Sequence, residues 1–578
     1  MVITRQKIKK RTILLFLLIL ATFLASGPAI QVFAGNISES ETVVPVHNPP
    51  ATPLPAQEPA TAEKTKGKEP EITPDPTQGQ EPAVTPEVTQ DQKTAVTPDP
   101  TQEREPAVTQ EAVQDEAPSV TQAPAQTETI TQEVTAEPSP TPVHKPVYKS
   151  KTLQLMESYD YVKNSTTGVS RAKKDLSSLQ RLMKKYGSLY GEGMPYEEYK
   201  EAMEYIWTDV TEYTKKPVQI SVDLKKSINY KSYVDILKKL SRIEGVFLYK
   251  IGESTEGRDI YAIELDFPSD CDKNVILLTG QIHAREFGAG SFLLKQIVDL
   301  AQKEQTDEKT MELLKRNKYV AIPIINVDGR EAIINSASQW TTKSGALWKA
   351  YVNGTDGNRN FPGLQWGQVI KGAKYMSIIP KSSAYANYPG PYAGFSKETK
   401  ALMKFLYHYV VVEQASIYLD YHSQGSVIYA GKSWQTKTQK QRCFDLRTNI
   451  LKVLNQGKNK RKYTVINEDD LYGLRGEGSS LTDYAVSLAV GAQFSPAYGF
   501  CVFVSDGKEY PLLQFKNLDS FKIKFKEANN KFAAITLEIG YGRDYLGNTA
   551  KTRGLLAKEY YNYNFDVLLE ALPSMIKK

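Results

Sequence analysis

Residues 225–578 predict an α/β domain with a mixed, mostly parallel central sheet flanked by helices. Short apolar runs with the character of buried strands, such as "NVILLTG" (274–280) and "AAITLEI" (533–539), alternate with stretches of helical apolar spacing, such as "SFLLKQIVDLAQK" (291–303). This alternation is typical of domains in which helices cover both faces of a sheet.

Polar residues stand where four of the expected strands end. Open α/β sheets carry their chemistry at the carboxyl ends of their strands. We therefore expect these residues to share one site: His283, Asp328, His422 and Glu538.

Residues 1–34 have the layout of a secretory signal peptide. A basic stretch (5–11) precedes an apolar run, and the small residues of "VFA" before Gly35 suit a cleavage site. An uncleaved N-terminal anchor is the alternative, because apolar character continues through the segment. A Gly-Pro break inside the segment favours cleavage. In both cases the rest of the chain is expected outside the cytoplasm, either secreted or associated with a cell wall or membrane surface.

Residues 35–146 predict a disordered linker rich in Pro, Thr, Glu and Gln. The stretch "TPDPTQGQEPAVTPEVTQDQ" from Thr73 recurs imperfectly as "TPDPTQEREPAVTQEAVQDE" from Thr97. Each unit lacks the apolar residues needed to bury a face, so the repeat predicts a partly polyproline-like tether rather than a solenoid. Such a spacer would hold a catalytic domain away from a membrane or within a cell wall.

Residues 147–224 predict a short helical segment. Apolar residues recur at helical spacing in stretches such as "PYEEYKEAMEYIWTDVTEYTKK". A small helical module, a pro-segment and an extension packed on the next domain all fit this pattern.

Composition excludes several classes of protein. The net charge is +6, but the basic residues are dispersed, and no basic run with interleaved aromatic residues follows the signal segment. Nucleic acid is therefore not an expected partner. Three cysteines allow at most one disulfide within the chain, so disulfides do not organise the fold. We expect a monomer.

A candidate metal site begins with His283 and Glu286 in "IHAREFGAG". A catalytic zinc needs three protein ligands and an open position for water, and this pair alone also fits a polar patch at the end of a strand. His408 lies in the apolar stretch "MKFLYHYVV" and is expected to be packed or on the surface. His422 ends a strand and is followed by Ser-Gln-Gly, as expected of a ligand that projects into a cleft.

From "YKIGESTEGRDIYAIEL" (249–265) to "ITLEIG" (535–540), the domain resembles the zinc carboxypeptidase family of metallopeptidases. The family includes pancreatic carboxypeptidase A and bacterial peptidoglycan γ-D-glutamyl-diamino acid peptidases. The resemblance implies one Zn²⁺ per chain, bound by His283, Glu286 and His422. It also implies that Glu538 is the general base. A Glu on an otherwise apolar strand is costly without a partner, which independently indicates a functional role for Glu538.

The same resemblance implies the substrate-binding residues. In "DGNRNFPG", Asn358 and Arg359 would hold the terminal carboxylate of the substrate, for which a planar guanidinium is well suited. Arg285 would line the outer substrate subsites. Thr482 would form the floor of the specificity pocket, and Tyr472 would cap the substrate.

The sequence departs from the family pattern at two places. Lys349, in "ALWKAYVNGTDGNRN", stands where the family has an Arg that polarises the scissile carbonyl, so that role falls to Lys349 or is lost. The chain before Glu538 is also longer than in typical members. This insertion, around 489–531, is expected to reshape or cover the substrate pocket.

Three functions follow as hypotheses. The first is a secreted zinc metallocarboxypeptidase that removes C-terminal residues from peptides, with Glu538 as the base that activates a zinc-bound water. The second is a peptidoglycan stem-peptide peptidase with the same mechanism, which the tether and the "HSQGSVIY" segment favour. The third is a non-catalytic cell-wall-binding protein, which the presence of all three ligands and the base argues against.

Overall fold

The computed structural model describes twelve ranges of the chain, and the expectations for 1–34 and 35–146 lie outside them. The described residues are 150–167, 193–213, 218–224, 226–341, 347–366, 388–423, 425–432, 434–456, 462–467, 479–512, 526–540 and 565–575.

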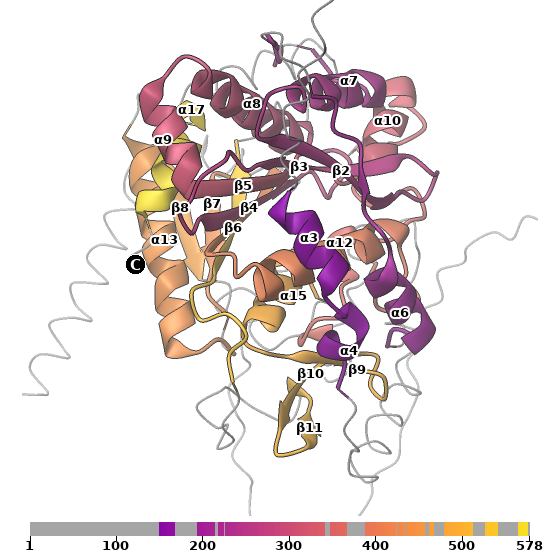
Figure 1. Cartoon of the computed structure of the whole chain (residues 1–578). Helices are drawn as coiled ribbons and strands as arrows, with labels where there is room; N and C mark the ends of the chain where they lie inside the picture. Colours follow the sequence, from indigo (N-terminus) through magenta and orange to yellow (C-terminus); the bar gives the residue numbers. More distant parts are fainter. Residues whose placement is uncertain are drawn as a thin grey trace, which may run out of the picture. The chain divides into compact units, whose positions relative to one another are not determined.

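Within these ranges, nine strands form the main sheet in the order β1-β2-β3-β5-β4-β6-β12-β7-β8. Figure 1 shows this sheet between two layers of helices. The strands are β1 (Thr208–Asp209), β2 (Val246–Glu253), β3 (Asp259–Leu265), β4 (Asn274–Gly280), β5 (Asn317–Ile322), β6 (Ile417–Ser423), β7 (Val427–Ala430), β8 (Thr464–Asn467) and β12 (Ala533–Ile539).

The four central strands, β5, β4, β6 and β12, run parallel to one another. Strands β3 and β7, on either side of them, run antiparallel. This arrangement confirms the predicted α/β fold with a mixed central sheet. The parallel strands are buried on both faces, which explains why their sequences are continuous apolar runs.

Successive side chains of β4 show how helices cover both faces of the sheet. Ile276 and Leu278 pack in the core that contains residues of α7, α8, α13 and α17. Val275 and Leu277 pack in the core that contains residues of α12 and α15. The helices are α7 (Tyr230–Leu240), α8 (Phe287–Glu304), α9 (Glu308–Arg316), α10 (Val327–Ser336), α12 (Lys397–Tyr407), α13 (Lys437–Asn455), α15 (Leu481–Ala489) and α17 (Phe565–Ala571), with short turns η1 (Gly357–Arg359), η3 (His408–Val412) and η7 (Leu572–Ser574).

The segment predicted as helical contributes α3 (Lys151–Ser158), α4 (Tyr161–Ser165), α6 (Tyr196–Glu204) and the edge strand β1. It packs on the following domain through a buried polar network. The Thr152 hydroxyl lies 2.7 Å from Glu264 and 2.6 Å from Glu413. The Lys318 ammonium donates to Thr152 at 2.8 Å and to Glu413 at 2.7 Å.

This network lies at the amino end of the parallel strands. Lys318 is the second residue of β5 and pairs with Val275, the second residue of β4. Since β4 runs from Asn274 to Gly280, its two ends lie about 20 Å apart at about 3.3 Å per residue. The N-terminal segment is therefore anchored at the end of the sheet opposite to the carboxyl end of β4.

The insertion around 489–531 forms a small antiparallel sheet of β9 (Gln493–Ser495), β10 (Phe500–Ser505) and β11 (Lys508–Tyr510) in its described part. It packs on the N-terminal segment, where the ring of Tyr199 stacks on that of Phe494 with centroids 3.8 Å apart. The amide of Cys501 also donates to the carbonyl of Pro362 at 2.9 Å, close to the predicted carboxylate-binding residues. The insertion thus connects the N-terminal segment to the segment that follows Arg359.

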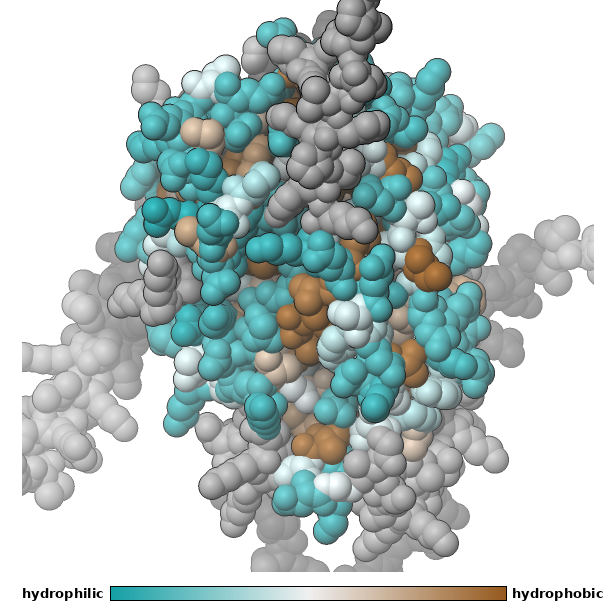
Figure 2. All heavy atoms as spheres, in the orientation of Figure 1, coloured by the Kyte–Doolittle hydropathy of each residue, from teal (hydrophilic) through white to brown (hydrophobic). Residues whose placement is uncertain are grey.

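The surface view in Figure 2 shows mostly hydrophilic residues, with hydrophobic ones in small separate patches. Across the described ranges, no helix combines the length and apolar character needed to span a membrane. Cys271, Cys443 and Cys501 are free thiols. In the part of the chain that the structure describes, the fold is therefore held by apolar packing and by buried polar contacts rather than by disulfides.

Replacing Thr152 by Val keeps its shape but removes the hydroxyl that Glu264, Glu413 and Lys318 share. We expect the free energy of unfolding, measured with urea, to fall by about 1–3 kcal/mol, because buried polar groups lose a partner. Ser158→Ala removes an exposed hydroxyl of the same helix and should change it by no more than about 0.5 kcal/mol. Equal stability of Thr152→Val and the native chain would show that the network does not anchor the segment.

Candidate metal centre

The loop between β4 and α8 carries two of the predicted ligands, His283 and Glu286, and polar side chains hold its shape. Gln281, at φ +50°, turns the chain out of β4, a conformation that non-glycine residues adopt rarely. Its side-chain amide donates to the carbonyl of Ala284 at 2.9 Å. Asn326 donates to the carbonyls of Ile282 and Ala350 at 3.1 and 3.0 Å. The two ligands are therefore presented by a buttressed loop.

Two glycines allow neighbouring segments to approach this loop closely. A Cβ on Gly290, in the first turns of α8, would lie 2.5 Å from Oε1 of Gln281 and 2.9 Å from the carbonyl of Pro323. A Cβ on Gly329 would lie 2.6 Å from the Cβ of Ala284. Packing therefore requires a glycine at position 290, the last residue of "IHAREFGAG".

His422 and Glu538 reach the loop from neighbouring strands. β6 pairs with β4 in parallel, with Tyr421 opposite Gly280, so His422 comes next to the loop. β12 pairs with β6 on its other side, with Glu538 opposite His422. Parallel pairing explains why residues distant in sequence meet at one edge of the sheet.

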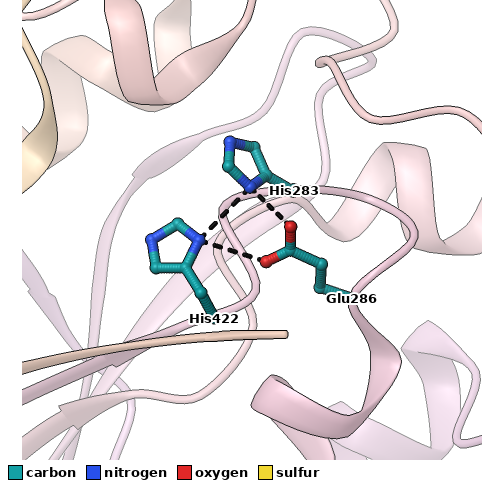
Figure 3. Close-up of side chains that lie close together, drawn as sticks. All are labelled: His283, Glu286 and His422. Carbon is teal, nitrogen blue, oxygen red and sulfur yellow. Dashed lines mark hydrogen bonds and ion pairs between the residues drawn. The ribbon is translucent and has the colours of Figure 1, made fainter. Parts of the chain in front are cut away.

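The side chains of His283, Glu286 and His422 point toward one another (Figure 3). Nδ1 of His283 lies 2.7 Å from Oε1 of Glu286 and 3.2 Å from Nδ1 of His422. Nδ1 of His422 lies 3.1 Å from Oε2 of Glu286. Burial disfavours the charge of Glu286, but the two imidazoles outweigh it and lower its pKa. These residues are the one group in the described ranges whose ligand atoms converge as in a metal site.

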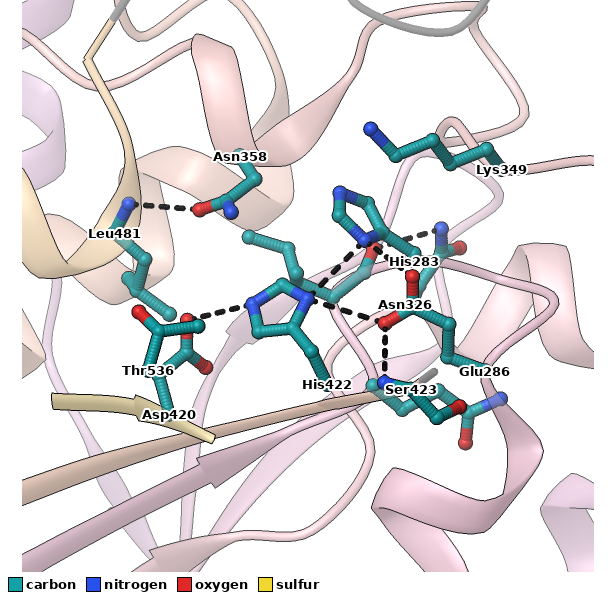
Figure 4. A network of polar contacts seen from close by, with 12 residues as sticks. His283, Glu286, Asn326, Lys349, Asn358, Asp420, His422, Ser423, Leu481 and Thr536 are labelled. Carbon is teal, nitrogen blue, oxygen red and sulfur yellow. Dashed lines mark hydrogen bonds and ion pairs between the residues drawn. The ribbon is translucent and has the colours of Figure 1, made fainter. Parts of the chain in front are cut away.

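The outer nitrogen of each imidazole faces a carboxylate. Nε2 of His283 lies 3.1 Å from Asp356, and Nε2 of His422 lies 2.9 Å from Asp420 (Figure 4). Each neutral imidazole carries one ring hydrogen, and when a metal ion takes the lone pair of Nδ1, the outer nitrogen carries that hydrogen and donates it to the carboxylate. Both Nδ1 atoms then present lone pairs to each other and to Glu286.

These donor atoms fit zinc. A zinc ion takes imidazole and carboxylate ligands, and two nitrogens bound at about 2.0–2.1 Å in a tetrahedron lie about 3.3 Å apart. The two Nδ1 atoms are 3.2 Å apart. Carboxylates that orient ligating histidines are a usual feature of zinc sites.

Glu538 is 2% exposed, and within the described ranges its Oε2 has no hydrogen-bond partner. Burial, reinforced by the charge of Glu286, raises its pKa to about 8. A divalent cation nearby would favour its ionised form. A buried carboxyl with a pKa near neutrality is suited to exchanging protons.

Asn358 and Arg359 lie in the turn η1. The Asn358 side-chain oxygen accepts from the amide of Leu481 at 3.0 Å (Figure 4), and Arg359 donates to the Asn358 carbonyl at 2.8 Å. Leu481 begins α15, which also carries Thr482, whose hydroxyl lies 3.3 Å from that of Thr536 on β12. The predicted carboxylate-binding and pocket-floor residues are thus joined through the start of α15.

Lys349 is buried and donates to Oδ2 of Asp356 at 2.7 Å, the same carboxylate that faces His283. Burial lowers the pKa of Lys349, and the charge of Asp356 opposes this. Arg285 is also buried, and its guanidinium lies 3.5 Å from the carbonyl of Leu347. Tyr472 lies outside the described residues.

Asp328 does not join the site expected for it. Although it follows β5, its carboxylate binds the hydroxyl of Ser254, the amide of Glu256 and the guanidinium of Arg258, each at 2.7 Å. It is the second residue of α10, and its side chain reaches the loop after β2. The expectation that all four strand-end residues share one site was wrong for Asp328.

Asp356, Asp420 and Asn326 were missed in the sequence. Asp420 had a detectable signal, because it stands two residues before His422 on one strand and so shares its face. Asp356 lies within the quoted "DGNRNFPG" segment, but its partner is 73 positions away. No local pattern identifies such a contact.

Comparison with known proteins shows which protein family the chain resembles. The family model described as "Zinc carboxypeptidase" matches residues 234–520. Mast cell carboxypeptidase A of Rattus norvegicus is 24% identical over 240 residues, which cover 40% of this chain and 55% of that protein. Carboxypeptidase B2 of Homo sapiens is 28% identical over 173 residues, which cover 30% and 38%. The chain thus spans about half or less of the length of these curated relatives.

Among solved structures, thrombin activatable fibrinolysis inhibitor aligns with a TM-score of 0.43 and 16% identity. The alignment covers 65% of this chain and 80% of that one.

His422→Ala removes one of the two facing imidazole nitrogens. We expect the zinc content after dialysis, measured by atomic absorption, to fall from about one per chain to a small fraction, since three protein ligands are required. His408→Gln is the matched control, because His408 is buried against Glu413 and lies outside the metal site. Full zinc content in folded His422→Ala would overturn the ligand assignment.

Proposed function

Because the chain belongs, through residues 234–520, to the zinc carboxypeptidase family, we propose that it is a secreted metallocarboxypeptidase that hydrolyses C-terminal peptide bonds. The observation that carries the proposal is the meeting of two imidazole Nδ1 atoms and the Glu286 carboxylate. The buried carboxyl of Glu538 stands on the strand beside them.

Zinc bound by His283, Glu286 and His422 would act as a Lewis acid that lowers the pKa of a water molecule and polarises the scissile carbonyl. Glu538 would accept a proton from the water that attacks the scissile carbonyl carbon, and would pass it to the leaving nitrogen as the carbon–nitrogen bond breaks. Its burial supports this role, because a carboxyl kept from bulk water exchanges protons with the substrate rather than with solvent.

The free carboxylate of the substrate binds to Arg359 and Asn358. A guanidinium holds a carboxylate through two parallel hydrogen bonds, and the amide of Asn358 adds a donor. The oxygen of that amide is already bound to Leu481, which orients its nitrogen. Recognition of a free carboxylate makes the enzyme an exopeptidase.

Lys349, with Arg359, supplies positive charge for the oxyanion that forms at the scissile carbonyl. Lys349 also donates to Asp356, whose carboxylate faces Nε2 of His283, so Lys349 helps to hold the acceptor of this metal ligand in place. Arg285 lines the outer subsites, Thr482 forms the floor of the specificity pocket, and Tyr472 caps the substrate.

The N-terminal segment is proposed to be a permanent part of the catalytic unit rather than a removable pro-segment. The buried polar network of Thr152 lies at the amino ends of β4 and β5, away from the metal ligands. Its contacts with the insertion continue to Pro362. The tether of residues 35–146 then connects this unit to a membrane or cell wall.

Peptidoglycan stem peptides are the second candidate substrate. The long Pro/Thr-rich tether suits an enzyme that works within a cell wall, and the "HSQGSVIY" segment resembles the wall-peptidase branch. The same site and mechanism serve both substrates, because both carry a free carboxylate beside the scissile amide.

The proposal is tested by incubating the zinc-loaded full chain with peptides that vary in their C-terminal residue and with peptidoglycan stem peptides. Products are identified by mass. We expect single residues to be released from peptides with a free carboxylate but not from their amidated counterparts, which cannot bind Arg359 in the same way. Cleavage of stem peptides alone would favour the second candidate.

Glu538→Gln is the catalytic control. It should retain zinc but lower kcat by about 10²–10⁴-fold, as expected when a general base is removed. Turnover by Glu538→Gln at the native rate would contradict the base assignment. Failure of the native, zinc-loaded chain to cleave any substrate would contradict the proposed activity itself.

A further inference from the structure

We propose that Asp420 is a positioning residue that fixes the ring of His422 and so directs Nδ1 of that ring toward the metal. The inference rests on the metal site of the proposed function, but it does not depend on which substrate the enzyme cleaves.

Asp420 is completely buried on β6 and lies on the same face of the strand as His422. Its Oδ2 lies 2.9 Å from Nε2 of His422. When a metal ion takes the lone pair of Nδ1, the ring hydrogen lies on Nε2, and the Asp420 oxygen accepts it and so holds the ring in this orientation. Figure 4 shows His422 between Asp420 and the other ligands.

The other oxygen of Asp420 is fixed by the neighbouring strand. Oδ1 accepts from the Thr279 hydroxyl at 2.7 Å, and Thr279 stands opposite Asp420 in the β4–β6 register. The Thr279 oxygen also lies 2.8 Å from the hydroxyl of Tyr418, on the same face of β6. The carboxylate is therefore held at both oxygens, and its orientation is set by the pairing of two central strands.

The two ligand histidines differ in how their carboxylates are compensated. Asp356, which faces His283, forms an ion pair with Lys349 at 2.7 Å. In the described ranges, Asp420 contacts the imidazole of His422 and the neutral hydroxyl of Thr279. The negative charge of Asp420 therefore acts mainly on the Nε2 hydrogen of His422, which increases the electron density at Nδ1.

This arrangement predicts a specific effect of Asp420→Asn. The amide keeps the size of the carboxylate but carries no charge, and its nitrogen can donate to Nε2, which would move the hydrogen to Nδ1 and block the ligand. The zinc dissociation constant, measured by competition with a chromophoric chelator, should rise by about 10–100-fold. Thr279→Val leaves the charge but frees the carboxylate, and should raise the constant by a smaller factor.

Asp328→Asn is the matched control. Asp328 is an equally buried aspartate that follows β5, another central strand of the sheet, but its partners are Ser254, Glu256 and Arg258. Asp328→Asn should keep the zinc dissociation constant within about twofold of the native value, because the carboxylate of Asp328 does not reach a metal ligand. All variants are measured below their unfolding transitions, with folding checked by circular dichroism. The visible spectrum of the Co²⁺-loaded protein should shift in Asp420→Asn but not in Asp328→Asn.

If folded Asp420→Asn has the same zinc dissociation constant and Co²⁺ spectrum as the native chain, the proposal is overturned and Asp420 is a purely structural residue. A native chain that binds zinc but cleaves no peptide would contradict the proposed function and leave this inference standing. A native chain that binds no zinc would overturn both.

Discussion

Two imidazole nitrogens that present lone pairs lie 3.2 Å apart beside a buried carboxylate, and a cation between them would satisfy all three groups. This constraint explains much of the surrounding structure. The outer nitrogens need acceptors, and Asp356 and Asp420 supply them. Asp356 in turn needs a counter-charge when it is buried, and Lys349 supplies it.

The order of the strands brings the backbone segments that carry these groups together. β4, β6 and β12 are adjacent and parallel, so the loop after β4, His422 on β6 and Glu538 on β12 reach one edge of the sheet. Gln281 and Asn326 then hold the loop in a shape that a flexible connection would not keep. Placing ligands on strands and buttressed loops keeps their geometry within narrow limits.

Much of this could be predicted from the sequence, because apolar runs identify buried strands and polar residues after them mark the carboxyl edge. His283, His422 and Glu538 were found in that way and do come together. Asp328 obeys the same rule but starts a helix that carries it elsewhere. Strand order decides which ends meet, and strand order is a long-range property that no local pattern reports.

The N-terminal segment shows the same limit. Its helical spacing was visible, but three roles fitted it equally well. The choice depends on Thr152 reaching Glu264 and Glu413, contacts that span 112 and 261 positions. The contact with Glu413 joins Thr152 to the residue that follows the π-helical turn η3. Such pairs leave no periodic signal in the sequence.

X-ray absorption at the zinc edge of the metal-loaded protein tests the central claim most directly. We expect the atoms nearest to zinc to be nitrogen and oxygen at about 2.0–2.1 Å, with the multiple-scattering pattern of two imidazoles. A shell that contains sulfur, a shell without imidazole scattering, or a spectrum of hydrated zinc would contradict the assignment of His283, Glu286 and His422 as the metal ligands.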